Sequence, residues 1–366
     1  MQAQGGAVGE QARGAEDAPD RDARRLRNGL LWSAGLGLLA VAVALAVPDL
    51  RGVLTRATHA QAIWLVVAGL LEVASCLGYV AILRLVLHRG PAREVRRLAW
   101  AEMAFGAVVP LGGAGGLAVG AWAMRAWGIP WSRVAERSAV IFLLTSALNT
   151  AVLGLAGLGI VLGVGSVHTG LQYGVVAAVV GLGALGAFAL LPWLTRIDPP
   201  WLRARRGFSA AQRLAGWIHA TLNVVGDRNW RLLGAPAYLL LDIAALWACF
   251  RAVGQSPPIV ALIAGYQIGY LANLVPIPGA IGAIGVLDGG LLAALHLYGL
   301  PLAPAATAII LYHTLALWLP ALGGTAGFVA LRRSLTETLG SGSALSASLP
   351  TATVAARAPR RLESRA

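Results

Sequence analysis

The stretch that decides the fold is NLVPIPGAIGAIGVLDGG, residues 273–290, where prolines, glycines and one aspartate interrupt strongly apolar sequence. An earlier stretch, AVVPLGGAGGLAVGAW at residues 107–122, has the same order of an apolar-Pro-apolar segment followed by small residues. In both cases the helix predicted next ends in Gly-apolar-Pro, at residues 128–130 and 299–301. Non-helical backbone at membrane depth is tolerated only where it is buried in protein or lines a wet cavity. We therefore predict two broken or re-entrant segments that line a polar cleft.

The composition is that of an all-α, polytopic membrane protein. Hydrophobic residues make up 57% of the 366 residues and charged residues 12%, against about 25% charged residues in soluble domains. Mean hydropathy is +0.70. The net charge of +13 comes from arginines between apolar runs and in the tails, where anionic lipid headgroups are the natural partner. We expect lipid contacts on the cytoplasmic side and no nucleic-acid binding; the sequence leaves the oligomeric state open.

The arginines also predict a topology. Apolar runs occupy residues 29–48, 61–87, 98–127, 138–164, 172–193, 233–253, 257–299 and 303–331. Arginine-rich loops lie on the cytoplasmic side, which places both termini there and makes the third and seventh runs return to the side they left. We expect about six spanning helices plus the two broken segments, in the cell membrane. Two full spans for 257–299, and cleavage of the first run as a signal, remain alternatives.

The two broken segments enter from opposite sides in this topology, which predicts an inverted repeat. A single domain at 28–332 would contain halves at about 28–165 and 171–332, with a cytoplasmic amphipathic segment at 199–230 lying on the leaflet or serving as a linker helix. Polar tails at 1–27 and 333–366 are predicted to be disordered. In transporters, paired Gly/Pro interruptions indicate a substrate site near the midplane.

Candidate site residues follow from these interruptions and from charges within apolar runs, which are costly and usually functional. The cleft candidates are Pro110, Gly112, Gly113, Gly115, Gly116, Pro276, Pro278, Gly279, Gly282, Gly285 and Asp288. The intramembrane candidates are Glu72, Glu102, Asp242 and His313. Structural alternatives remain for several of them, because Asp288 at a helix start is also a capping residue and His313 is also a core histidine. Glycines such as Gly157 and Gly181 are interpreted as helix-packing surfaces.

No motif for catalysis, cofactor binding or metal binding was found. The glycine-rich GGAGG at 112–116 is not followed by Lys-Ser/Thr, as a phosphate-binding loop requires. No histidine spacing suggests a zinc site. The two cysteines lie inside apolar runs, so neither a disulfide framework nor a metal cluster is expected. We expect a protein that is not an enzyme and has no cofactor.

The segment YLANLVPIPGAIGAIGVLDGGLLAALHLYGLPLAPAATAIILYHTLALWLPALGG, residues 270–324, resembles the C-terminal signature of the lysylphosphatidylglycerol synthase transmembrane-region family, also called flippase-like or UPF0104 proteins. AFGAVVPLGGAGGLAVGAW and the later FLLTSALN resemble the first signature, and the resemblance covers about 60–332. All the cleft candidates match these two signatures. The acidic residue and arginine that often follow the family's first glycine pair are apolar residues and Gly120 here, and its arginine in the last span is His313.

The resemblance implies a lipid-flippase domain that moves a phospholipid or a polyprenyl-linked headgroup through the cleft. It does not imply lysyl-lipid synthesis, because the soluble aminoacyl-transferase domain of two-domain members is absent from this sequence. Two other classes of function remain open. One is an accessory subunit or enzyme of lipid-linked glycan assembly, and the other is a structural or partner-binding membrane protein.

Overall fold

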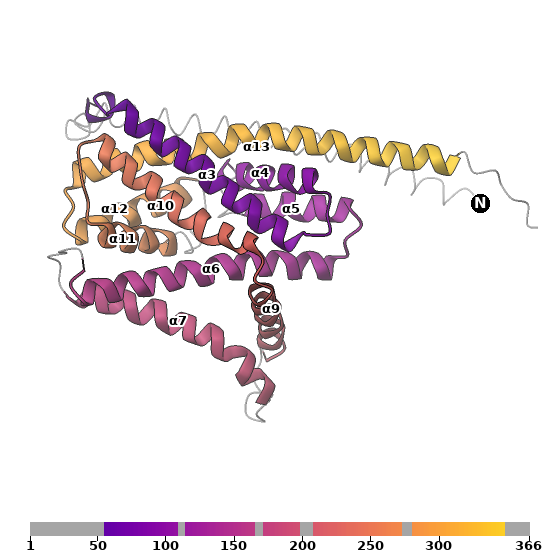
Figure 1. The fold of residues 1–366 in the computed structure, drawn as a ribbon, viewed down its shortest axis with the longest axis horizontal. Coiled ribbons are helices and arrows are strands. Elements are labelled where there is room, and N and C mark those ends of the chain that lie inside the picture. Colours follow the sequence, from indigo (N-terminus) through magenta and orange to yellow (C-terminus); the bar gives the residue numbers. More distant parts are fainter. Residues whose placement is uncertain (1–54, 109–113, 165–170, 198–207, 273–279, 348–366) are drawn as a thin grey trace, which may run out of the picture.

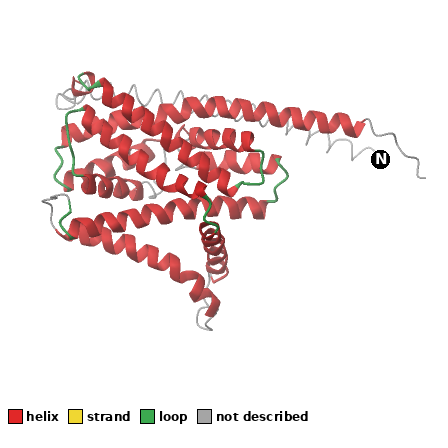
Figure 2. Cartoon of the chain, viewed as in Figure 1, coloured by secondary structure: helices red, strands yellow, loops and turns green. Residues whose placement is uncertain are grey.

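The computed structural model describes residues 55–108, 114–164, 171–197, 208–272 and 280–347, and these residues contain helices but no strand (Figures 1 and 2). The elements are α3 (Ala62–Val86), α4 (Ala92–Val108), α5 (Ala114–Ala126), α6 (Trp131–Val161), α7 (Leu171–Ile197), α9 (Phe208–Gly226), the 3₁₀ helix η1 (Trp230–Leu233), α10 (Gly234–Ala252), α11 (Ile259–Ala272), α12 (Ala280–Leu297) and α13 (Leu302–Ala347). The prediction of an all-α, multi-pass membrane protein is confirmed.

Five segments are long and apolar enough to cross a bilayer. They are Ala62–Val86, Trp131–Val161, Leu171–Arg196, Trp230–Ala252 and Leu302–Thr336. The predicted first span, 29–48, lies outside the described residues. Prolines mark several helix starts, because Pro91, Pro130, Pro258 and Pro301 directly precede α4, α6, α11 and α13. A proline there loses no hydrogen bond, since the first amides of a helix have no partner within the helix.

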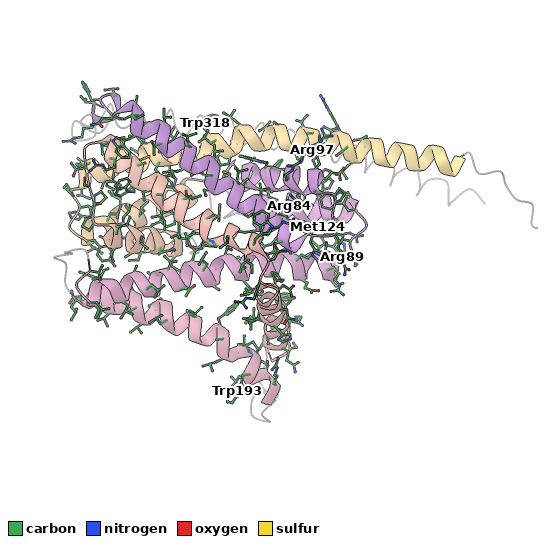
Figure 3. All side chains as sticks on the ribbon, in the orientation of Figure 1. Arg84, Arg89, Arg97, Met124, Trp193 and Trp318 are labelled. Carbon is green, nitrogen blue, oxygen red and sulfur yellow. The ribbon has the colours of Figure 1, made fainter. Side chains whose placement is uncertain are left out.

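Four of the connections between helices lie at two opposite ends of the bundle. The α3–α4 and α5–α6 connections lie at one end, and the α10–α11 and α12–α13 connections lie at the other (Figure 2). Figure 3 shows Arg84, Arg89 and Arg97 toward the first end, where α3 finishes and α4 begins. The pair α4–α5 and the pair α11–α12 therefore each begin and finish at the same end, and the two pairs open toward opposite ends.

Helix α11 is shorter than a full membrane span. An α-helix rises about 1.5 Å per residue, so the 14 residues of α11 extend about 21 Å. This is short of the roughly 30 Å of hydrocarbon in a bilayer. The 18 residues of α12 extend about 27 Å, which is close to that thickness.

The predicted breaks are shorter than the sequence suggested. Helix α5 begins at Ala114, so Gly115 and Gly116 are helical. Helix α12 begins at Ala280, so Gly282 and Gly285 are also helical, and Asp288 lies in the third turn. The prediction of Asp288 at a helix start is wrong, because a cap must reach the free amides of the first turn. Glycine lowers helix propensity by only about 1 kcal/mol, which neighbouring helices can offset.

Two helices lie partly or wholly in segments that were predicted to connect or follow the spans. Helix α13 is 46 residues long and continues to Ala347, so it includes residues 333–347 of the predicted tail. Helix α9 occupies the middle of the predicted amphipathic segment and is seen end-on in Figure 1, across the direction of α6 and α7. Ala215, Ile218 and Thr221 of α9 are buried, and α9 packs against α6 and α7.

Tight contacts between helix backbones depend on glycine. A Cβ atom added to Gly157 of α6 would lie 2.3 Å from the amide nitrogen of Ala178, and one added to Gly181 of α7 would lie 2.4 Å from the amide nitrogen of Gly154. No real Cβ fits at such distances, so the prediction that Gly157 and Gly181 are packing residues is confirmed. A similar contact between α3 and α10 positions the candidate site.

Candidate functional site at the crossing of α3 and α10

Helices α3 and α10 run antiparallel and touch through their backbones. A Cβ atom on Gly78 would lie 2.6 Å from the amide nitrogen of Tyr238, and one on Gly234 would lie 2.6 Å from the carbonyl oxygen of Gly78. The Ser75 hydroxyl donates to the carbonyl oxygen of Tyr238 at 2.7 Å. These three contacts fix the register between the two helices.

This register places Glu72 opposite Asp242. From the Ser75–Tyr238 bond, Glu72 lies about one turn toward the start of α3, and Asp242 about one turn toward the end of α10. The Ser75–Tyr238 bond and the Gly78 contact therefore bring the two carboxyl groups to the same level of the helix pair. Glu72 is only 5% exposed, so this is a pair of acidic groups in the apolar interior of the bundle.

Two tyrosines from other helices complete the surroundings of Asp242. The Tyr312 hydroxyl of α13 donates to Asp242 Oδ1 at 2.7 Å, and the Tyr266 hydroxyl of α11 donates to Asp242 Oδ2. The two rings meet edge to face, with centroids 6.5 Å apart. The side chain of Asp242 therefore connects α10 with α11 and with α13.

Glu72 is hydrogen-bonded far less completely than Asp242. The Cys76 thiol is 4.0 Å from Glu72 Oε1 and is a weak donor. Glu72 Oε2 is buried and has no hydrogen-bond partner among the described residues, and the same holds for Gln267 Nε2 on α11. Buried polar atoms of this kind are rare and call for an explanation, such as a proton, a water molecule or a ligand.

A second buried acidic group lies on the other side of the Gly78–Gly234 contact. Glu102 of α4 is 8% exposed, and its Oε2 accepts a hydrogen bond from the Tyr79 hydroxyl at 2.7 Å. A Cβ atom on Gly120 of α5 would lie 2.1 Å from Glu102 Oε1. Gly120, one of the departures from the family signature, thus leaves the space that Glu102 fills.

The two acidic sites are connected along α3. Ser75, Cys76 and Tyr79 follow Glu72 at three, four and seven residues, which matches the α-helical period, so the four side chains share a face. The Tyr79 ring lies 5.5 Å from the Tyr238 ring, centroid to centroid. A polar stripe therefore extends from Asp242 through Glu72 and Cys76 to Tyr79 and Glu102.

The structure brings together some of the predicted site residues and not others. Glu72 and Asp242 meet, Glu102 is linked to them through Tyr79, and the His313 ring packs beside Tyr312 at 4.9 Å between centroids. Outside the described residues lie Pro110, Gly112, Gly113, Pro276, Pro278 and Gly279. Nor is the side chain of Asp288 described.

Sequence reasoning missed the tyrosines. Tyr79, Tyr238, Tyr266 and Tyr312 surround the two acidic sites, although each looks like ordinary apolar filling in its own run. A usable signal existed, since Tyr79 follows Glu72 at seven residues and Asp242 follows Tyr238 at four, which places each pair on one helix face. Among the residues described, no group of three or more Asp, Glu, His or Cys side chains is arranged to hold a metal ion.

Comparison with known proteins agrees with the resemblance noted in the sequence. The family described as "Lysylphosphatidylglycerol synthase TM region" matches residues 31–324. A "UPF0104 membrane protein" of Methanothermobacter thermautotrophicus is 54% identical over 43 residues. That match spans 12% of this chain and 12% of the length of the relative, so it supports the family and carries no detail of function.

Proposed function

The chain belongs to the lysylphosphatidylglycerol synthase transmembrane-region family, and from this premise we propose that it moves a lipid headgroup across the membrane. The headgroup would be that of a phospholipid or of a polyprenyl-linked lipid. The observation that carries the proposal is the presence of two buried acidic sites, the Glu72–Asp242 pair and Glu102. They lie near the α4–α5 and α11–α12 pairs, which are called hairpins below. A lipid-exposed helix bundle has no need of such groups, because charge and unpaired polar atoms inside a membrane are costly.

An inverted repeat would supply the two-sided access that such movement needs. Three observations support the repeat. The α4–α5 pair and the α11–α12 pair open toward opposite ends of the bundle (Figure 1). Helix α4 packs on α13 of the other half, and α11 packs on α6 of the other half. We infer that each half of the repeat packs one helix of its hairpin against the other half, around the crossing of α3 and α10.

Helices α5 and α12 end in the same way, and α6 and α10 also end at left-handed glycines, Gly163 and Gly254, with the same five-residue bond. Helix α5 ends with Gly128 at φ 78°, and α12 ends with Gly299 at φ 87°. In each the amide after the glycine bonds the carbonyl five residues back, Ile129 to Met124 at 3.0 Å and Leu300 to Leu295 at 3.1 Å. This is the Schellman motif, which needs a left-handed residue and so favours glycine. The two Gly-apolar-Pro segments thus end their helices in the same way.

The distribution of arginines supports a cytoplasmic location for the first end of the bundle. Arg89, Arg93, Arg96 and Arg97 lie where α3 is followed by α4, and Arg133 and Arg137 open α6. Arginine-rich loops remain on the cytoplasmic side during insertion. An orientation test would place single cysteines at Ser132 and at Ser256, using a membrane-impermeant maleimide on whole cells. We expect labelling of Ser256→Cys alone. Labelling of Ser132→Cys instead would show that the arginine-rich end faces the outside.

The central experiment measures lipid movement in proteoliposomes. A fluorophore-labelled phospholipid is bleached from outside, and movement appears as loss of the inner-leaflet signal. We expect loss with the protein and none in protein-free vesicles, for at least one lipid in a set of anionic phospholipids, zwitterionic phospholipids and polyprenyl-phosphate sugars. Loss of signal from no lipid in the set would contradict the proposal.

Matched variants show whether the acidic sites take part. We expect Asp242→Asn and Glu102→Gln to slow the movement about tenfold, which corresponds to about 1.4 kcal/mol in the barrier. Gly183→Ala is the control, because nothing lies within 4 Å of a Cβ atom at that position of α7. The proposal assigns no covalent chemistry to the chain, and it takes anionic membrane lipids as the partner of the arginine-rich end.

A further inference from the structure

Two acidic groups that face each other inside the bundle raise a question that lipid movement does not answer. Glu72 and Asp242 come from α3 and α10, and the Ser75–Tyr238 bond and the Gly78 contact hold them in register. Side by side in a low-dielectric interior, two carboxylates repel strongly and seldom both keep their charge. Something between them has to neutralise one negative charge.

The hydrogen bonds indicate which carboxyl carries the charge. Asp242 accepts from two phenol hydroxyls, one on each oxygen, and such donors stabilise a carboxylate. Glu72 Oε2 accepts from no described residue, and Glu72 Oε1 faces only the weak Cys76 donor. A protonated carboxyl has a donor of its own, and the neighbouring Asp242 carboxylate is an acceptor.

The groups around the pair offer no strong positive charge. The titratable side chains that face it are Cys76 on α3, Tyr238 and Cys249 on α10, Tyr266 on α11, and Tyr312 with the adjacent His313 on α13. Within the described part of the chain, no arginine makes an ion pair with Glu72 or Asp242. The ion pair between Arg133 and Glu136 lies elsewhere, at the start of α6. Neutral phenols and thiols do not replace a counter-ion.

We propose that Glu72 and Asp242 form a proton-binding site, in which Glu72 holds the proton and donates it to the Asp242 carboxylate. The tyrosines of α11 and α13 stabilise the anionic partner. The site holds one exchangeable proton at neutral pH, at the place where both halves of the bundle meet. This inference concerns proton binding alone, so it stands whether or not the protein moves lipid.

Infrared spectroscopy tests the site without any transport assay. A protonated carboxyl has its own C=O stretching band, which is separate from that of a carboxylate. The purified full-length protein is measured at neutral pH in a maltoside detergent, which has no ester carbonyl. We expect a band that Glu72→Gln removes and that Asp242→Asn shifts, because the proton then meets a neutral acceptor. An unchanged band in Glu72→Gln would overturn the proposal.

Two controls separate this site from other carboxyls. Glu136→Gln changes a surface carboxyl that pairs with Arg133, and Glu102→Gln changes the other buried carboxyl; neither should alter the band assigned to Glu72. Size-exclusion profiles establish that each variant is folded. If Glu72→Gln does not fold, Tyr312→Phe provides the test, since loss of one donor to Asp242 should shift the Glu72 band, and a band left in place would count against the site.

A bound metal cation is the alternative that the same chemistry could support. Thermal unfolding of the wild-type protein in sodium chloride and in choline chloride, at equal ionic strength, distinguishes the two. We expect the same unfolding temperature in both salts. A higher temperature in sodium alone, abolished by Asp242→Asn, would identify a cation site and overturn the proposal.

Discussion

The two buried acidic sites are built from similar parts but differ in charge. At the Glu102 site one carboxyl meets one phenol, Tyr79, and fills a space left by Gly120. At the other site two carboxyls share one interior and two phenols bond the same Asp242. The first is a single polar anchor between α3 and the hairpin α4–α5. The second has one carboxyl more than its donors can satisfy, and this excess makes it a candidate for reversible binding.

Both sites depend on the contact between Gly78 and Gly234, so disrupting this contact should abolish the difference between them. A Cβ on Gly78 meets backbone atoms of α10 at 2.6 and 2.8 Å, and backbone cannot rotate aside. We expect Gly78→Ala to destabilise the protein by about 3 kcal/mol and to lower its unfolding temperature most among these variants. Gly216→Ala on α9, with open space around it, is the control. Equal melting of the two variants would show that the crossing is not tight.

Removing one phenol should affect the paired site strongly. Tyr312→Phe deletes the 2.7 Å hydrogen bond to Asp242 Oδ1 and leaves the ring in place. Hydrogen bonds to charged groups contribute about 1.5–3 kcal/mol, so we expect a loss of about 2 kcal/mol. A double-mutant cycle with Asp242→Asn measures the coupling. A coupling energy near zero would mean that Asp242 is not the anionic partner.

The single site should respond less. Gly120→Ala places a Cβ 2.1 Å from Glu102 Oε1, but that atom ends a flexible side chain that can move away. We expect loss of the Tyr79–Glu102 hydrogen bond and a cost of about 1 kcal/mol, seen as a small fall in unfolding temperature. Tyr79→Phe should then add almost nothing to Gly120→Ala. Fully additive costs would show that Gly120 acts elsewhere.

An exposed carboxyl gives the smallest effect and sets the baseline. Glu136 pairs with Arg133 at 2.9 Å, and the side chains are 36% and 65% exposed. Exposed pairs typically contribute less than about 1 kcal/mol, so Glu136→Gln should change stability by no more than about 0.5 kcal/mol. The comparison of unfolding temperatures with the buried variants is made in the same detergent. A larger loss would point to an unrecognised role at the arginine-rich end.

Much of the fold could be predicted from the sequence because apolar runs, proline positions and arginine bias each report on local physics. Arginine counting predicted that 98–127 and 257–299 return to the side they left, and the Gly-apolar-Pro pattern predicted the helix ends at Gly128 and Gly299. Gly157 and Gly181 are interpreted as packing residues because glycine in a membrane helix lets two backbones approach closely. These features need no knowledge of the partner segment.

The candidate site could be predicted only in part, because it depends on which helix faces meet. Glu72 and Asp242 are separated by most of the domain, and their contact follows from the register that Gly78 and Gly234 set. The length of the breaks was overestimated for a related reason. Glycines at 282 and 285 are weak helix formers in isolation, whereas here the helix includes both, and a single sequence does not show when tertiary contacts override propensity.

The packing of α4 on α13 has a consequence for the synthesis and membrane insertion of the protein. Arg97 of α4 donates to the carbonyl oxygen of Ala330 at 3.3 Å, across 233 positions of the chain. Chains are synthesised at about 5–20 residues per second, so the last helix emerges some 10–50 s after the first hairpin. Throughout that interval Glu102 lies in the α4–α5 hairpin, while α13, which packs against α4, has not yet been made. The α4–α5 hairpin must therefore be held at the membrane surface or within the insertion machinery until α13 has been made.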